Sequence, residues 1–495
     1  VITNETPQQI RQMLRETPNL EGCLMVGDIP SARYNVTSPP SWREPKYEVF
    51  PTDFYYMDLD GCWNDINNDG IFDEHKGNIA PEIWIGRLNA PVSSIEEQIK
   101  FLKRYFNKNH LYRIGAYSLP YKALIYHDDI YERESCDWIE RSLTTNAALS
   151  LIYAERVVIS DSEVTCAADY LNRLTEGWSF VHVEVHGNPF QHFFKRGNGQ
   201  EWNGNVSSND IRKINPKAHF FLLLSCYNAL YTEQNYIAGW YLFSDYGLLV
   251  ISSTKAWSWI YDFYSLHFCW GLSMSFNFGR ALLSYIHECI NHKKHPANYY
   301  GITILGDPLL RIVYNGVDGD GDCLADWFEL ENGLDPGNPD SDGDGLTDYE
   351  ELIYEANPLN PDSDRDGLPD GEEIRLDGDP LDPDTDDDGL TDGEECHLGT
   401  AINASDSDFD GLLDGEEVEI GTDPLNGDTD GDGLTDYAET LKGTNPLSKD
   451  TDKDYWNDYV DPDPLNALIP NVILASIVVI IGLTAVAPKI SRTPG

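Results

Sequence analysis

The sequence of 495 residues is poor in positive charge: 34 Lys and Arg stand against 84 Asp and Glu, a formal net charge of −50. The imbalance is concentrated in residues 317–463, which hold 49 of the acidic residues and only 5 Lys or Arg. A chain without a basic stripe repels phosphate backbones, so the composition argues against a nucleic-acid partner and favours divalent cations. The rest of the chain is nearly neutral and has enough apolar and aromatic residues for a hydrophobic core.

The nine cysteines form no C-x-x-C pair and have no zinc-site spacing. They therefore indicate no disulfide framework. The sequence also lacks a signal-like segment before the folded part, and residue 1 is Val. We therefore expect the chain to be processed or to be a fragment.

A long uncharged run occurs near the C-terminus, where residues 467–487 form 21 consecutive positions without a charge. At ~1.5 Å per residue a helix of this length crosses a hydrocarbon core of ~30 Å. Lys489 and Arg492 follow, and the positive-inside bias places the tail 488–495 in the cytoplasm. The sequence thus predicts a single transmembrane helix with the preceding chain outside the cell; a buried core helix is the alternative.

The acidic segment is a repeat of 22 residues in seven copies, each of the form D-x-D-x-D-G-L-x-D-x-x-E. Acidic residues at positions 1, 3, 5, 9 and 12, with Gly at 6, have the oxygen-ligand spacing of an EF-hand loop. Ca²⁺ is therefore the predicted cofactor. The predicted ligands, copy by copy, are Asp318, Asp320, Asp322, Asp326 and Glu329; Asp340, Asp342, Asp344, Asp348 and Glu351; Asp362, Asp364, Asp366, Asp370 and Glu373; Asp384, Asp386, Asp388, Asp392 and Glu395; Asp406, Asp408, Asp410, Asp414 and Glu417; Asp428, Asp430, Asp432, Asp436 and Glu439; and Asp450, Asp452, Asp454, Asp458 and Asp461.

The ten residues between loops are too few for the long helices that flank an ordinary EF-hand. Gly at position 16 and Pro at position 19 instead predict one short helical turn per copy. The array resembles the bacterial relatives of thrombospondin type 3 repeats, which implies a chain wrapped around a row of Ca²⁺ ions. The first copy has Cys323 in place of Gly and the last has Trp456 at position 7, departures that suit terminal caps. The alternative is a disordered acidic stalk.

The N-terminal three-fifths has a different pattern, in which continuous apolar runs alternate with helical stretches. This order predicts an α/β fold with a mainly parallel sheet that is covered on both faces. Helices are expected at 131–147, 162–175 and 264–290. Strands are expected at 23–28, 121–126, 155–160, 179–187, 219–226 and 247–254.

Two successive predicted strands end on reactive side chains, His186 and Cys226. Parallel neighbours lie ~4.8 Å apart, so an imidazole and a thiol at their carboxyl ends can reach one peptide carbonyl. Gly187 lets a substrate approach the backbone, and its N–H with that of Cys226 is the predicted oxyanion site. The alternative is a buried small cysteine and an ordinary loop histidine.

His-Gly after one strand and Ser-Cys after the next resemble the caspase-like cysteine peptidases, specifically the gingipain-type branch. The resemblance covers most of residues 1–314, with all of its blocks in the same order. The supporting blocks are MVGDIP at 25–30, the tyrosine-rich acidic loop at 53–75, PEIWIGRL at 81–88, GLLVISSTKAWSW at 247–259 and GITILGDPLLRI at 301–312.

The resemblance implies that His186 is the general acid/base and that Cys226 is the nucleophile, which forms a thioester acyl-enzyme. Glu82 matches an acidic position that orients the histidine, and Trp259 matches a pocket-wall tryptophan. The acidic residue that selects basic side chains in gingipains has no match, so specificity for Arg or Lys is not implied.

A second cation loop is possible in the N-terminal part, where the spacing 1-3-5-6-9 recurs but position 12 is Lys76. A Ca²⁺ ion there needs additional oxygen, from Asp58 or Asp60. The alternative is a solvated acidic turn. The residues of this loop are Asp65, Asn67, Asp69, Gly70 and Asp73.

The combined prediction is a prokaryotic cysteine endopeptidase, anchored at the cell surface, that acts on peptides or proteins. Two alternatives remain: a calcium-dependent adhesion protein with a non-catalytic head, and a transpeptidase. Product analysis with and without an added amine separates hydrolysis from transfer. The predicted parts are two caspase-like subdomains at 1–117 and 118–314, the repeats at 318–463, the transmembrane helix at 467–487 and the tail at 488–495.

Overall fold

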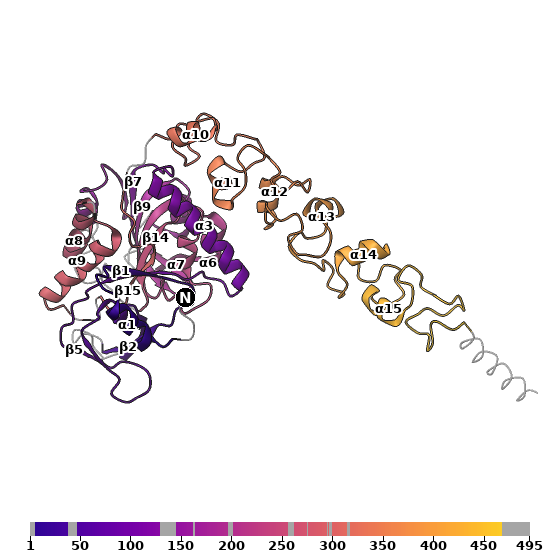
Figure 1. The fold of residues 1–495 in the computed structure, drawn as a ribbon, viewed down its shortest axis with the longest axis horizontal. Helices are drawn as coiled ribbons and strands as arrows, with labels where there is room; N and C mark the ends of the chain where they lie inside the picture. The colour runs from indigo at the N-terminus through magenta and orange to yellow at the C-terminus, as the bar shows by residue number, and fades with distance from the viewer. Residues whose placement is uncertain are drawn as a thin grey trace, which may run out of the picture. The chain divides into compact units, whose positions relative to one another are not determined.

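The computed structural model describes residues 5–37, 47–128, 145–161, 164–196, 201–255, 262–274, 276–294, 296, 299–313 and 317–467 (Figure 1). The chain forms two compact units. Unit 1 comprises Val1–Pro339 and Asp348–Ile353, and unit 2 comprises Asp340–Thr347 and Tyr354–Gly495.

Unit 1 is built around one eight-stranded sheet with the order β1-β6-β15-β14-β13-β9-β7-β8. Every neighbouring pair is parallel except β14 and β15, which are antiparallel. This confirms the predicted mainly parallel α/β fold, and each of the six expected apolar runs overlaps a strand. The strands are β1 (Gly22–Val26), β6 (Trp84–Leu88), β7 (Lys122–His127), β8 (Glu155–Ile159), β9 (Trp178–Glu184), β13 (Ala218–Leu224), β14 (Leu249–Ser253) and β15 (Ile302–Gly306).

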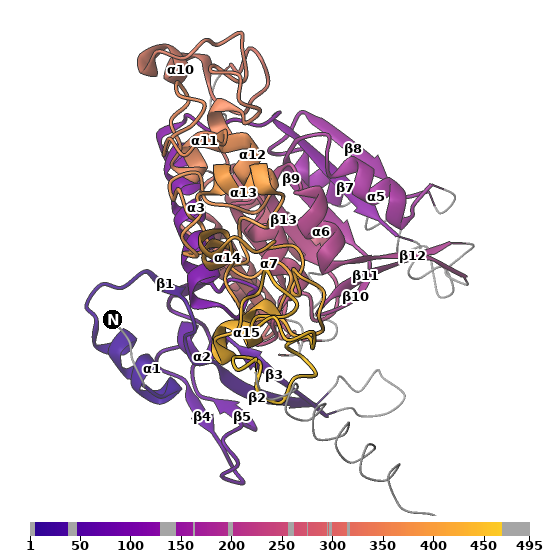
Figure 2. The ribbon, with the colours of Figure 1, turned by 90° about the vertical axis from the view of Figure 1, so that its right-hand side faces the viewer.

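Helices cover both faces of this sheet, which is why the central strands are mostly apolar (Figures 1 and 2). Four helices pack on one face around buried residues such as Tyr105, Val181, Phe221 and Tyr241. On the other face Phe278 packs against Phe220, with ring centroids 4.7 Å apart. The first group is α3 (Ile95–Ile114), α5 (Ala167–Arg173), α6 (Ser208–Ile214) and α7 (Ile237–Leu242); the second is α8 (Asp262–Ser273) and α9 (Phe278–Asn291).

Smaller elements surround the sheet. The hairpins pair β2 with β3, β4 with β5, and β10, β11 and β12 in sequence, all antiparallel. Their bounds are α1 (Pro7–Glu16), β2 (Ala32–Thr37), β3 (Tyr47–Thr52), α2 (Phe54–Met57), β4 (Cys62–Asn64), β5 (Glu74–Lys76), β10 (His186–Asn188), β11 (Gln191–Arg196) and β12 (Glu201–Ser207).

The expected helices agree with the structure in part. The stretch 162–175 contains α5, whereas 131–147 lies almost entirely outside the described residues. The expectation of one helix at 264–290 is wrong, because the chain forms α8 and α9 there. Asn277 causes the break, since its side chain accepts a hydrogen bond from the Arg280 N–H at 2.8 Å and caps the N-terminus of α9.

The two expected subdomains share one sheet. Strands β1 and β6 come from residues before 118 and join β15, which comes from near the end of the head. The subdomain boundary at 117 and 118 therefore crosses a continuous sheet and stays a prediction.

Each of the first six repeats contributes a short helix that begins at position 9, as the Gly and Pro pattern predicts, whereas the seventh repeat forms turns and bends over its described residues. Gly333, Gly399, Gly421 and Gly443 follow four of these helices in the left-handed conformation, with φ between 78° and 87°. The helices are α10 (Asp326–Asn332), α11 (Asp348–Tyr354), α12 (Asp370–Arg375), α13 (Asp392–Leu398), α14 (Asp414–Ile420) and α15 (Asp436–Lys442).

The first repeat and most of α11 belong to unit 1, so the compact head extends beyond the expected end at residue 314. Tyr349 of α11 stacks on Tyr117 with ring centroids 4.4 Å apart. Its hydroxyl donates a hydrogen bond of 2.6 Å to the Asp245 carbonyl oxygen.

Successive repeats in unit 2 are joined by one recurring hydrogen bond. The backbone N–H at position 10 donates to the position-5 carboxylate of the preceding repeat, over 2.5–3.0 Å. Each repeat is thus tied directly to its neighbour. The pairs are Gly371 with Asp344, Gly393 with Asp366, Gly415 with Asp388, Tyr437 with Asp410, and Tyr459 with Asp432.

Across the part of the chain that the structure describes, no helix has the length and apolar character needed to span a membrane. The predicted transmembrane segment 467–487 lies outside that part except for Ala467.

Candidate functional site

Three polar residues lie at corresponding positions at one edge of the sheet. His186, Cys226 and Lys255 each come two residues after the end of a strand, namely β9, β13 and β14. The strands are parallel neighbours, and Leu224 at the end of β13 pairs with Glu184 at the end of β9. The register therefore places all three residues at the same edge, as the sequence predicts for the first two.

Contacts between the segments after the strands support this placement. The Tyr227 N–H, next to Cys226, donates to the Lys255 carbonyl oxygen at 3.1 Å. A Cβ atom at Gly187 would lie only 2.0 Å from Ser225 Oγ, so only glycine fits there without a shift. The backbone after His186 thus lies directly against the residue before Cys226.

His186 is half-buried, and its ring contacts the exposed Trp202 with centroids 5.8 Å apart. Burial, together with the positive charge of Lys195, lowers the pKa of His186 to about 4. The imidazole is therefore neutral near pH 7 and able to accept a proton. Trp202 was not identified from the sequence. It lies on β12, and the three-stranded sheet β10-β11-β12 brings it close to His186 on β10.

Cys226 is half-buried, whereas Cys62 and Cys396 are exposed. The next residue, Tyr227, has a φ of 59°, a left-handed conformation that costs a non-glycine residue on the order of 1–3 kcal/mol. Such strain is typical of turns that present a functional side chain.

Lys255 is a further candidate residue that the sequence analysis missed. It is 2% exposed, and its Nζ lies 3.7 Å from the Glu48 carboxylate. Burial lowers the pKa of Lys255, while the negative charges of Glu48 and of the Cys226 thiolate raise it. Its position in the sequence could have identified it, since Lys255 comes two residues after the end of β14, as Cys226 comes two residues after the end of β13.

The other predicted head residues are less well placed. Glu82 precedes β6, which lies four positions from β9 in the sheet; its carboxylate accepts from the Leu59 N–H at 2.6 Å. Burial raises the pKa of Glu82 to about 7, and Asp58 and Asp60 are close to it. An orienting role for Glu82 stays a prediction that the strand order does not favour. Trp259 lies outside the described residues.

The loop of residues 65–73 has the same local fold as the repeat loops. The Gly70 N–H donates to Asp65 at 2.8 Å, as the Gly345 N–H donates to Asp340 at 3.1 Å. Asp69 and Asn67 also bond within the loop, and Asp73 accepts from the Ile66 N–H. Asp58 and Asp60, the suggested extra ligands, form a carboxylate group with Glu82, and a contribution from them to the loop stays a prediction.

In the repeats the predicted ligands divide into two clusters, which differs from a single five-ligand loop. Positions 1, 3 and 5 form one cluster, as in Asp318, Asp320 and Asp322. Position 12 joins position 5 of its own repeat and position 9 of the next, as in Asp322, Glu329 and Asp348. The helix explains the division, because position 9 begins it and bonds back to position 2 of its own loop, as Asp370 does with Ser363.

The second cluster has the chemistry of a cation site. Glu329 and Glu373 are fully buried, and neither carboxylate oxygen of either residue has a hydrogen-bond partner within the described part of the chain. Burial raises the pKa of Glu373 to about 9, with Asp364 and Asp366 adding to the rise. Buried carboxylates of this kind need a compensating charge, and their hard oxygen atoms suit Ca²⁺.

Comparison with known proteins agrees with both parts of the chain. The family described as Peptidase family C25 matches residues 3–313. The family described as Bacterial TSP3 repeat matches 340–361, 362–383, 384–400, 406–427 and 428–449, which leaves out the degenerate first and seventh copies. Among curated proteins, none matches the chain.

Two solved structures are similar to the head. One is the crystal structure of the Arg-specific cysteine proteinase gingipain R (RgpB). Its sequence is 16% identical to this chain, the TM-score is 0.43, and the match covers 63% of this chain and 69% of that chain. The complex of the pro- and mature domains of RgpB from Porphyromonas gingivalis is 15% identical with a TM-score of 0.42, over 63% and 70% of the respective chains.

Proposed function

We propose, from the premise that the chain belongs to peptidase family C25 and is a cysteine-type peptidase, that it is an endopeptidase with Cys226 as nucleophile and His186 as general acid/base. The observation that carries this assignment is the register of β9 and β13, which brings the residues after both strands to one edge. The direct approach of Gly187 to Ser225 at the same point supports it.

In the proposed mechanism the neutral imidazole of His186 takes the proton of the Cys226 thiol. The sulfur attacks the peptide carbonyl carbon, and the backbone N–H groups of Gly187 and Cys226 stabilise the oxyanion. The C–N bond then breaks, and the departing amine receives the proton from His186. Water, activated by the same imidazole, hydrolyses the thioester and regenerates the thiol.

Lys255 has a positioning role in this proposal, because its buried cation favours the thiolate form of Cys226. We expect Lys255→Met to slow alkylation of Cys226 by a peptidyl electrophile at neutral pH and to move the pH profile of the reaction upward. Glu48→Gln should have the opposite effect, since it removes the carboxylate that competes for the Lys255 charge. The measurement is the alkylation rate as a function of pH, with the modified residue identified by mass spectrometry.

The matched control is Lys122→Met, which removes a charge at the opposite edge of the sheet, where Lys122 lies 4.4 Å from the Trp178 ring centroid. It should leave the profile unchanged. The exposed Cys62 and Cys396 serve as internal references, and Cys226 should react much faster than either despite being less exposed. Labelling spread evenly over the cysteines would contradict the assignment of Cys226 as the nucleophile.

The proposal also includes Ca²⁺ bound by the repeats and by the loop at 65–73. The support for the repeats is the pair of carboxylate clusters in the first repeat, with Asp322 at position 5 shared between them, and the matching cluster of Asp340, Asp342 and Asp344 in the second. The support for the head loop is its hydrogen-bonding pattern, although Lys76 at position 12 bonds to Glu74 and supplies no oxygen.

The last part of the proposal is a cell-surface location with residues 467–487 as a membrane anchor and a cytoplasmic C-terminus. It is supported by the 21 uncharged residues and by the Lys489 and Arg492 that follow them. A chain ending at Pro464 should be recovered in the aqueous fraction after cell lysis, whereas the full chain should sediment with membranes. Persistent sedimentation of the shorter chain would contradict the anchor.

A further inference from the structure

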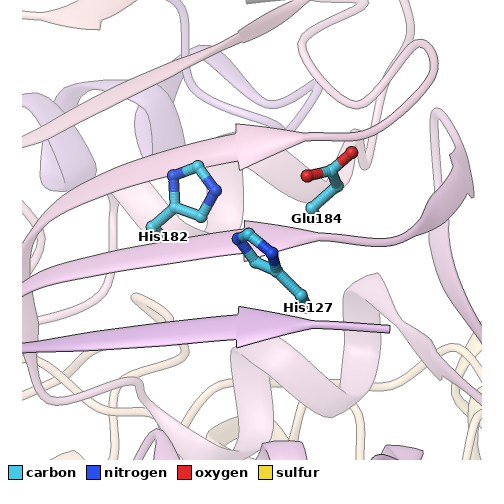
Figure 3. A group of neighbouring side chains, drawn as sticks. All are labelled: His127, His182 and Glu184. Carbon is cyan, nitrogen blue, oxygen red and sulfur yellow. The ribbon is translucent and has the colours of Figure 1, made fainter. Parts of the chain in front are cut away.

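A second group of polar side chains lies on one face of the sheet, next to the end of the strand that precedes His186. His127 is the last residue of β7, and His182 and Glu184 are on β9. In the parallel register Ile125 pairs with His182, and His127 pairs with Glu184. Alternate residues of a strand share a face, so all three side chains are on the same face of the sheet (Figure 3).

The three residues are close enough to bind one ion. One nitrogen of each imidazole and one oxygen of Glu184 all lie within 4.8 Å of one another. The two imidazole rings have centroids 5.0 Å apart. His127 is 5% exposed and His182 is 1% exposed, whereas Glu184 is half-buried. The group therefore combines a buried pair of imidazoles with a carboxylate at its more accessible side.

His182 has no explanation as an ordinary core residue. Both of its ring nitrogens are buried, and neither has a hydrogen-bond partner within the residues that the structure describes. An unsatisfied buried polar group costs about 1–3 kcal/mol, so a core position would favour an apolar side chain. Burial, with His127 beside it, keeps the pKa of His182 well below its usual value, so the imidazole is neutral, the form that ligates a metal ion.

We propose that His127, His182 and Glu184 form a binding site for one divalent transition-metal ion of the Zn²⁺ type. Two neutral imidazoles with one carboxylate suit such an ion and not the hard cation of the repeats, which prefers oxygen ligands only. Three protein ligands leave a coordination position for water or another small ligand.

An ion at this site would tie β7 to β9 two residues before His186. It would therefore fix the edge of the sheet that presents the proposed general base. The inference does not depend on the assignment of Cys226 or His186, because it rests on residues outside the proposed catalytic pair and is tested by metal binding.

The test uses the full chain, with accessible thiols alkylated and Ca²⁺ in excess to occupy the carboxylate clusters. Co²⁺ is the probe, because four-coordinate Co²⁺ absorbs strongly in the visible range. We expect one equivalent to produce this absorption, Zn²⁺ to displace it, and Zn²⁺ to raise the thermal unfolding temperature. His182→Gln, His127→Gln and Glu184→Gln should each abolish the absorption.

The matched control is His192→Gln, another fully buried histidine, whose ring packs against Tyr170 and Tyr241 on the opposite face of the sheet. This variant should keep the absorption. If the variant at the buried His182, His182→Gln, fails to fold, the absorption of the variant at the half-buried Glu184, Glu184→Gln, tests the site instead. Absence of visible absorption in the wild-type chain, or its retention in Glu184→Gln and His127→Gln, would overturn the proposal.

Discussion

Replacing either Cys226 or His186 by alanine should lower the rate of peptide cleavage by at least ~10³-fold, because each removes a group without which the acyl transfer cannot proceed. Without the thiol no thioester forms. Without the imidazole of His186, the proposed mechanism has no group that accepts the thiol proton or returns it to the leaving amine. The measurement is kcat/KM on a peptide substrate, with circular dichroism to show that the head remains folded.

The double variant gives the sharper result. Groups that act as one unit are strongly non-additive, so the Cys226→Ala, His186→Ala pair should be no slower than either single variant. Cys62→Ala, which removes an exposed thiol from the head, should cleave at the wild-type rate. Residual cleavage in Cys226→Ala near the wild-type level would show that the nucleophile is elsewhere. It would also revive the alternative of a head that only binds.

The main features of the head could be predicted because its central strands are buried on both faces. A strand such as β13 is then almost continuously apolar, and the residue where the apolar run stops marks the carboxyl edge of the sheet. Cys226 and His186 were located in this way. Lys255 obeys the same rule and was overlooked only because a lysine after a strand has no obvious chemical meaning until Glu48 and Cys226 are found beside it.

Other features depend on contacts between distant segments, which periodicity does not contain. The position of β15 between β14 and β6 is one example, since nothing in its five residues specifies that it pairs antiparallel with β14 and parallel with β6. The pairing of His127 with Glu184 is another, because it depends on the register of β7 against β9. A sequence reading treats His127 and His182 as unrelated residues 55 positions apart.

The repeats show the same limit on a smaller scale. Their 22-residue period, glycine caps and short helices follow from the sequence, because each is a local property of one copy. The division of the acidic residues between two clusters does not, because position 12 meets position 9 of the next copy. A ligand set written for a single loop therefore assigns Glu329 and Asp348 to different ions, although the structure brings them together.

Removal of Ca²⁺ should unfold the repeats while leaving most of the peptidase activity intact. Each cluster holds carboxylates whose repulsion is on the order of 1 kcal/mol for a close pair in water, and a repeat has little apolar core to oppose it. The proposed cysteine chemistry requires no Ca²⁺. Chelation should increase the radius of gyration of a chain ending at Pro464 and decrease its helical signal, and added Ca²⁺ should reverse both. Small-angle scattering and circular dichroism measure these changes.

A single substitution tests whether the repeats fold as one array. Asp388 accepts hydrogen bonds from the Leu390 N–H at 2.8 Å and from the Gly415 N–H of the next repeat at 3.0 Å, and it lies beside Glu395. Asp388→Ala should therefore weaken two cation sites and one junction together, so that folding of the array requires more Ca²⁺. Asp382→Ala removes the same charge from an exposed position outside the clusters and should have no such effect. If chelator and Ca²⁺ change neither dimensions nor spectrum, the acidic clusters do not hold Ca²⁺. If the two variants require the same Ca²⁺ concentration for folding, the total charge of the array determines its folding, and the shared carboxylate of Asp388 has no special role.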